Sequence, residues 1–198
     1  SDNIFMGYDA GGGTWTDADS NRNIAIGNYT MDAATAGALD SVAVGHYALS
    51  SITSGDYNTA LGSNAGLSIT TGGSNVVIGY LAGDTMTDTS NTVLIGKSAG
   101  QAINSSDANY AIAIGFDALA DLTSGQGTTA IGYRALADVT TGDYNTALGY
   151  AAGDGMTTGL SNTLMGWGAG GASGFNAGGY NVMLGAEAGG SAITPYSN

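Results

Sequence analysis

The sequence predicts an all-β parallel β-solenoid (a β-roll or β-helix) of eleven coils of about 17 residues, and three observations support this prediction. A short apolar stretch closed by glycine recurs eleven times, seven of the ten intervals between these glycines are 17 or 18 residues, and alanine stands three residues after ten of them. A repeat of this length is typical of solenoids, whose coils stack on one another. The closing glycines are Gly7, Gly27, Gly45, Gly62, Gly79, Gly96, Gly115, Gly132, Gly149, Gly166 and Gly185.

The three residues before each glycine form the expected main strand. The residue directly before the glycine is always large and apolar, and the residue three before it is Ile, Val or Thr, so these two columns share one face of the strand. The middle residue is apolar too, which means that both faces must be covered. We expect the residue before the glycine to fill the coil, and the middle column to lie at a trimer axis or in the core. The middle column includes Ala43, Ala60, Val77, Leu94, Ala113, Ala130, Ala147 and Leu164.

After the glycine, the alanine is expected to lie on a second short strand. The next residue is Gly in seven coils and Leu or Met in four, which indicates a corner that is either sharply turned or filled by a side chain. A third apolar column follows, and each of its residues is followed by threonine and by turn residues. This column contains Ile52, Ile69, Met86, Leu122, Val139 and Met156, and the threonines are Thr53, Thr70, Thr87, Thr123, Thr140 and Thr157.

An asparagine usually precedes the main strand, and its side chain can bond to neighbouring backbone, so the stacked asparagines are expected to form a ladder. These residues are Asn3, Asn23, Asn58, Asn75, Asn91, Asn145, Asn162 and Asn181. The longer coils carry their extra residues at 12–15, 104–106 and 171–174, between the expected strands. Residues 45–79 closely match residues 132–166, which indicates duplication of a multi-coil block. Residues 1–198 are therefore expected to be a single repeat domain, a segment of a longer fibre protein.

Composition argues against several functions. Three Lys or Arg against sixteen Asp or Glu give a net charge of −13, which opposes binding to nucleic acid and to anionic membrane surfaces. No apolar stretch is long enough for membrane insertion. With His46 as the one histidine and no cysteine, hydrolytic triads and transition-metal sites lack their parts, so we expect no enzyme, no catalytic residues and no cofactor.

Calcium is the one ion left open. Acidic residues lie in the loops, but the spacing of known Ca²⁺-binding repeats is absent, so solvated turn residues are preferred and no metal ligand is assigned. These acids are Asp17, Asp19, Asp56, Asp84, Asp88, Asp107 and Asp143.

One aromatic stripe stands out at the position directly after the glycine. It can stack sugars at the surface or pack in the groove between chains, and the second interpretation is preferred because alanines nearby leave room for rings. The stripe contains Tyr80, Phe116, Tyr133, Tyr150 and Trp167.

The repeat resembles two families over essentially the whole chain. Asn-Thr-Ala-Leu-Gly-Tyr-Ala-Ala-Gly at 145–153, Ser-Val-Ala-Val-Gly at 41–45 and Ile-Ala-Ile-Gly at 112–115 resemble the head repeats of YadA-type trimeric autotransporter adhesins. That resemblance implies three chains in a left-handed parallel β-roll whose strands meet near the trimer axis. The longer form, with its added Thr-Thr-Gly loop, looks more like repeats of tail fibres and other structural proteins of tailed phages.

These observations lead us to expect a homotrimer that serves as a rigid shaft or head segment of a phage tail fibre, located in the virion and used for host attachment. The alternative is the head of a bacterial trimeric adhesin, at the cell surface and extracellular. A remote third function is ice binding through the threonine row. The expected partners are further copies of this chain and a cell-surface glycan or protein receptor.

Overall fold

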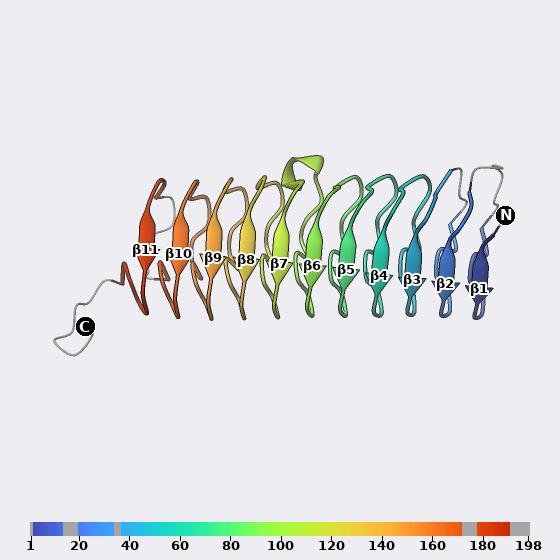
Figure 1. The fold of residues 1–198 in the computed structure, drawn as a ribbon, viewed down its shortest axis with the longest axis horizontal. Helices are drawn as coiled ribbons and strands as arrows, with labels where there is room; N and C mark the ends of the chain where they lie inside the picture. The colour runs from blue at the N-terminus through green and yellow to red at the C-terminus, as the bar shows by residue number, and fades with distance from the viewer. Residues whose placement is uncertain (1, 14–19, 34–36, 172–177, 191–198) are drawn as a thin grey trace.

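The computed structural model describes residues 2–13, 20–33, 37–171 and 178–190. Eleven three-residue strands form one parallel sheet in which the strand order follows the chain order, so the described part of the chain is a β-solenoid (Figure 1). The strands are β1 (Ile4–Met6), β2 (Ile24–Ile26), β3 (Val42–Val44), β4 (Thr59–Leu61), β5 (Val76–Ile78), β6 (Val93–Ile95), β7 (Ile112–Ile114), β8 (Thr129–Ile131), β9 (Thr146–Leu148), β10 (Thr163–Met165) and β11 (Val182–Leu184). A short 3₁₀ helix, η1 (Ser106–Ala108), protrudes from the loop before β7.

Successive strands pair in exact repeat register. Ala130 in β8, for example, is opposite Ala147 in β9, and Ile131 is opposite Leu148. At about 4.8 Å per strand, the eleven coils extend over roughly 50 Å. The predicted all-β parallel solenoid is therefore confirmed, with its coils repeating about every 17 residues.

The expectation that the residue before the glycine fills the coil is wrong. The middle column of β2 to β10, including Ala130 and Leu164, is completely buried inside the coil of a single chain, so of the two places expected for it, trimer axis or core, it occupies the core. The residue before the glycine points outward instead, as Leu61 and Leu148 do with about half of their surface exposed. The physical reason is space, because the interior must also hold the alanine and the third apolar column, all of which are buried. The small middle residues leave that room. The residues listed above for the expected axis or core column, from Ala43 to Leu164, all lie in this interior.

The expected second strand is absent from the described residues after the glycine. The chain turns there, with left-handed backbone at alternate positions such as Arg134 and Leu136, where φ is 51° and 50°. Backbone hydrogen bonds still join the coils, since Arg134 N donates to the carbonyl of Phe116 and Leu136 N donates to that of Ala152. The buried alanine, Ala135, lies between these two turns.

The corner after the alanine is filled in the way the Gly-or-Leu alternation indicates. Leu136 is completely buried, and a Cβ atom placed on Gly153 of the next coil would overlap its Cδ2. Likewise a Cβ on Gly66 would lie 3.0 Å from Cδ2 of Leu49. Leu49 and Leu136 therefore each occupy the space that glycine leaves in the next coil, and at these two places the corner residues of neighbouring coils are complementary.

The asparagine ladder is present and buried. Asn75 Nδ2 donates to Asn58 Oδ1 over 3.0 Å, and Asn162 Nδ2 makes the same bond to Asn145. Asn91 was wrongly included, because it is exposed and one position out of register, and Thr92 takes the ladder position and donates to Asn75. The coil from Gly79 to Gly96 has the regular 17 residues, so threonine replaces asparagine at the ladder position and Asn91 stands where Ser74 stands one coil earlier.

Candidate functional site

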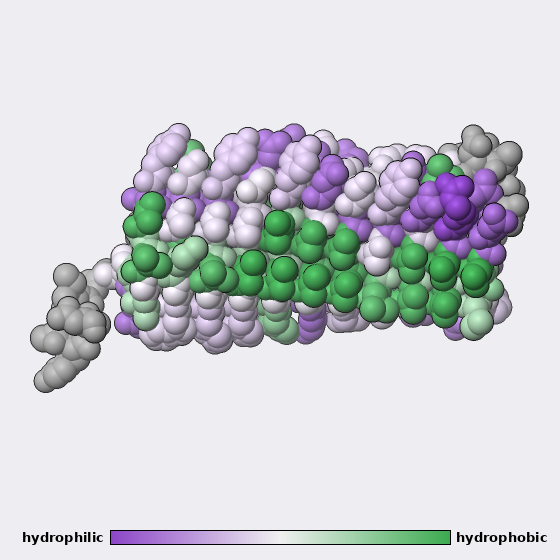
Figure 2. Space-filling model, viewed as in Figure 1, coloured by the Kyte–Doolittle hydropathy of each residue, from purple (hydrophilic) through white to green (hydrophobic). Residues whose placement is uncertain are grey.

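The outward side of the sheet is an apolar surface that we call the strand face. It consists of the first and third residues of the strands, and none of these side chains is buried. The third positions are all apolar: Met6, Ile26, Val44, Leu61, Ile78, Ile95, Ile114, Ile131, Leu148, Met165 and Leu184. The first positions are Ile4, Ile24, Val42, Thr59, Val76, Val93, Ile112, Thr129, Thr146, Thr163 and Val182. Figure 2 shows the result as a continuous hydrophobic band along the solenoid.

A band of this extent is unusual for a surface in contact with water. Contiguous exposed apolar patches on soluble proteins are normally small, and larger ones mark interaction sites. A strand that is wetted on one side ordinarily alternates apolar with polar residues. The strand face breaks that pattern in every coil, so it is the candidate functional site of the chain.

The predicted aromatic stripe borders the strand face. Phe116 and Tyr133 stack with their centroids 5.4 Å apart, and Tyr133 and Tyr150 stack at 4.8 Å, with nearly parallel planes in both pairs. Both faces of the Tyr133 ring are therefore covered by neighbouring rings, which leaves ring edges at the surface. Such a stack suits apolar packing against another surface better than it suits stacking of a sugar on Tyr133. Tyr80 and Trp167 continue the stripe and are about half exposed.

Two further groups of aromatic rings were not predicted as groups from the sequence, although His46 was considered as the one histidine. Tyr8, Tyr29, His46 and Tyr47 form a cluster at the first coils, where Tyr29 and Tyr47 stack at 4.9 Å and His46 meets Tyr47 edge-on at 4.2 Å. A row of exposed tyrosines also stands five residues before the glycine, on the other border of the strand face. Its members are Tyr57, Tyr110, Tyr144 and Tyr180. The signal for the row was its fixed distance from the glycine, whereas the members of the cluster stand one or two residues after it.

The few basic residues are engaged with neighbouring coils. Arg22 forms a bidentate ion pair with Asp40, and this hydrogen bond lowers the pKa of the Asp40 carboxyl and raises that of the guanidinium. Arg134 bonds to Asp154 over 3.0 Å, and Lys97 lies over the ring of Phe116 at 5.0 Å from its centroid. These contacts join successive coils on a surface that is otherwise strongly acidic.

The threonine row is used within the protein. Thr53 Oγ1 donates to the carbonyl of Thr70 over 3.0 Å, and Thr123 and Thr140 each donate to the corresponding carbonyl of the next coil. Their hydroxyl hydrogens are therefore engaged between coils. The hydroxyl groups of the row therefore have fewer donor hydrogens for ordering water, and the arrangement gives no support to ice binding.

Asp84 is the acid in the least favourable environment. Its Oδ1 is buried without a hydrogen-bond partner, and burial raises the pKa of its carboxyl above the ordinary value. Within the described ranges, no three acidic or histidine side chains come together in a way that could hold a metal ion. Two of the acids considered for calcium, Asp17 and Asp19, lie outside the described residues.

Among the residues described, no helix is both long enough and apolar enough to cross a bilayer. Comparison of the chain with protein-family models, with curated proteins and with solved structures gives no match.

Proposed function

We propose that this chain is a rigid fibre segment that assembles as a homotrimer through its strand face and serves in attachment to a host surface, as in the tail fibre of a phage. The observation that carries the proposal is the outward apolar column that continues through all eleven strands. Burying a large aliphatic side chain contributes about 1.5–3 kcal/mol when exposure is the alternative. A column of such residues therefore strongly favours a covered state.

Further copies of the same chain are the natural occupants of this surface. The strand face is straight and repeats at the same rise in every copy, so parallel copies can match it coil by coil. The stacked rings of Phe116, Tyr133 and Tyr150 border it and add apolar area at the rim. The resemblance to trimeric adhesin heads and phage fibre repeats supports three copies and a left-handed coil. The trimeric adhesin of a bacterial surface uses the same assembly in another setting.

The mass of the particle in solution tests the assembly. Light scattering is expected to give three times the chain mass of 19.4 kDa. Replacing Ile131 and Leu148 together by Glu is expected to give a folded monomer, while the loop change Asp143→Asn leaves the trimer intact. A wild-type chain of monomeric mass overturns the proposal.

A separate test is needed to distinguish a phage tail fibre from a bacterial surface adhesin. Purified trimer labelled with a fluorophore is expected to bind to intact cells of the bacterial host and to compete with phage adsorption. Binding to animal cells or to extracellular matrix, with no effect on phage adsorption, would instead favour the bacterial adhesin.

A further inference from the structure

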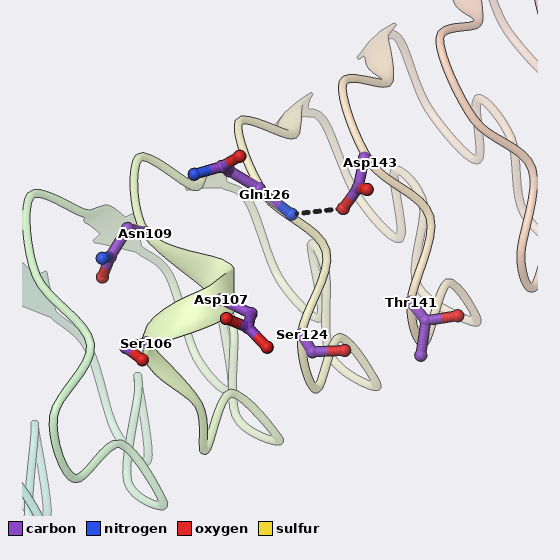
Figure 3. Close-up of a pocket in the computed structure, with 7 residues that line it drawn as sticks. All are labelled: Ser106, Asp107, Asn109, Ser124, Gln126, Thr141 and Asp143. Atoms are coloured by element: carbon purple, nitrogen blue, oxygen red, sulfur yellow. Dashed lines mark hydrogen bonds between the residues drawn. The ribbon is translucent and has the colours of Figure 1, made fainter.

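A polar groove lies on the loop side of the solenoid, away from the strand face. It crosses three coils beside η1, has a volume of about 600 Å³, and lies between two rows of polar side chains (Figure 3). The residues between the rows are Ala108, Gly125 and Gly142, which are small and buried and so leave space between the two rows. The groove is lined by Ser106, Asp107, Asn109, Ser124, Gln126, Thr141 and Asp143.

The coil register sets the two rows. Asp107, Ser124 and Thr141 stand eight residues before their glycines, and Asn109, Gln126 and Asp143 stand six before. The coil that ends at Gly115 is 19 residues long, and its extra residues are those at 104–106, directly before and within η1. This insertion raises one wall of the groove, which explains why the concavity forms at these coils.

The structure leaves polar atoms available in the groove. Asn109 Oδ1 accepts from Ser90 N over 2.7 Å and Asp143 Oδ1 accepts from Gln126 N over 2.9 Å, so each side chain is held in place by one atom and presents its other. The hydroxyls of Ser106, Ser124 and Thr141 and the carboxylate of Asp107 have no hydrogen-bond partner within the described part of the chain. The groove thus presents hydroxyls that can donate or accept, amide groups, and carboxylates that accept.

One tyrosine, Tyr144, follows the lining residue Asp143 and is bonded to a second lining residue, Gln126. Tyr144 donates from its hydroxyl to Gln126 Oε1 over 2.7 Å, and its ring covers Gly127, where an added Cβ would lie 3.0 Å from Cδ1. The ring is therefore fixed over backbone, and the side chain remains more than half exposed. Unlike Tyr133, Tyr144 has no stacked neighbour among the described rings, so one of its faces is open to a ligand.

These features restrict the ligand class. Asp107 and Asp143 belong to coils about 10 Å apart along the axis, too far to share a cation with ligand distances of about 2.5 Å. The backbone offers no free strand edge for a peptide, because Gly127 N and Tyr144 N already donate to the preceding coils. The net charge of −13 repels anionic ligands. A neutral, hydroxyl-rich ligand with an apolar C–H face matches the hydroxyls and amides of the groove and the open face of the tyrosine ring.

We propose that this groove binds a neutral oligosaccharide, with hydrogen bonds from the two polar rows and one sugar ring packed on Tyr144. Two coil rises accommodate a short stretch of two or three sugar units along the solenoid axis. The inference rests on the proposed function, because it names the receptor class of an attachment fibre. The groove lies in the loops and not on the strand face, so assembly and binding can occur together.

The duplicated block supplies matched controls. Tyr57 has the same Asp-Tyr-Asn-Thr-Ala-Leu-Gly context as Tyr144 but no η1 beside it, and Asp88 holds the position of Asp107 one coil earlier, outside the groove. Serine occupies the tyrosine position at Ser74 and Ser161 with the same left-handed backbone, so Tyr144→Ser and Tyr57→Ser are both compatible with the fold.

The test is titration of the purified protein with a panel of neutral trisaccharides built from glucose, mannose, galactose or N-acetylglucosamine, followed by calorimetry or saturation-transfer NMR, with sialyllactose as the anionic comparison. At least one neutral member is expected to bind, and Tyr144→Ser and Asp107→Asn are each expected to weaken it about tenfold or more. Tyr57→Ser and Asp88→Asn should leave the affinity unchanged.

Failure of every neutral probe at about 10 mM overturns the inference. It is also overturned if sialyllactose binds equally well, or if the groove variants bind like the wild type. Light scattering on the same samples separates the two proposals. If the protein is a trimer that binds no sugar, only the proposed sugar site is wrong. If it is a monomer that binds sugar, only the proposed trimer is wrong.

Discussion

Asn162 donates from Nδ2 to Oδ1 of Asn145 over 3.0 Å in the interior of the solenoid, one coil apart. The same Oδ1 accepts from the backbone N of Asn162, also at 3.0 Å, and Asn145 Nδ2 donates to the carbonyl of Gly159 over 2.6 Å. One buried side chain therefore satisfies polar groups in the next coil on two sides. Because each ladder residue serves its neighbour in this way, the ladder links the coils as a series.

Replacing Asn145 by leucine, a side chain of similar size, is expected to destabilise the fold by about 2–4 kcal/mol, because it leaves the Gly159 carbonyl and the backbone N–H of Asn162 buried without partners. Chemical denaturation measures the change. The control is Asn91→Ser at the exposed position outside the ladder, where an effect within about 0.5 kcal/mol is expected. Equal losses for both variants would contradict a structural role for the ladder.

The glycine that closes each strand is required for two structural reasons. At Gly132 φ is 136°, and an added Cβ would overlap the backbone carbonyl of Gly149 in the next coil. Neither problem can be relieved by rotating a side chain, so Gly132→Ala is expected to cost at least about 3 kcal/mol. Gly168 is the matched control, because its φ of 63° is shared with Ala151 at the same coil position and the nearest atom to its Cβ would be 3.8 Å away. Gly168→Ala should change the midpoint of thermal unfolding little.

The complementary corner predicts non-additive effects. Leu136→Ala is expected to cost about 2–5 kcal/mol by opening a cavity, and Gly153→Ala is expected to be destabilising because its Cβ would overlap Leu136. In the double variant the new methyl group occupies the space that Leu136 vacates. The double variant should therefore lose less free energy of unfolding than the two single variants lose together, by about 1 kcal/mol or more. Simple additivity would show that the two corners do not share space.

Much of the fold could be predicted because the period is nearly constant. The glycine position fixed the strand boundaries, and the third apolar column and the ladder followed from it. The second strand could not be distinguished from a turn, because buried alanine suits both, and the left-handed backbone at Arg134 and Leu136 is occupied by residues that do not normally favour it.

The prediction that the residue before the glycine points into the coil was wrong for a different reason. Both faces are apolar, so hydropathy does not say which one points inward. The larger side chains, directly before the glycine, were therefore expected in the core. The interior holds side chains from several walls of the coil, and alanine at position 130 or 147 is what makes room for them. The groove could not be predicted because its shape depends on η1 as well as on the repeat.

The burial of Asp84 predicts a pH effect on stability. Because burial raises the pKa of this carboxyl in the folded state, its favourable contribution is present below the ordinary value of 3.8 and is lost as pH rises through the folded pKa. Asp84→Asn is therefore expected to raise the melting temperature at pH 7, and the gain should vanish near pH 3. Thermal scans across this range measure it, and Asp88→Asn reports the effect of removing one negative charge from an exposed turn nearby. A gain that is equal at both pH values would contradict the assignment.

Two adjacent residues of one strand separate folding from assembly. Ala130 is completely buried, and Ile131 is exposed on the strand face. Ala130→Arg places a charge in a filled interior, so it is expected to abolish the cooperative unfolding transition and the β-sheet circular dichroism signal. Ile131→Arg leaves the interior unchanged, and with it the β-sheet signal, but it places a charge in the proposed interface and should shift the particle to monomeric mass. Tyr133→Ser together with Tyr150→Ser should weaken the trimer in the same way, because it removes the stacked rings at the border. If Ile131→Arg stayed trimeric with an unchanged melting temperature, the strand face could not be the contact between chains.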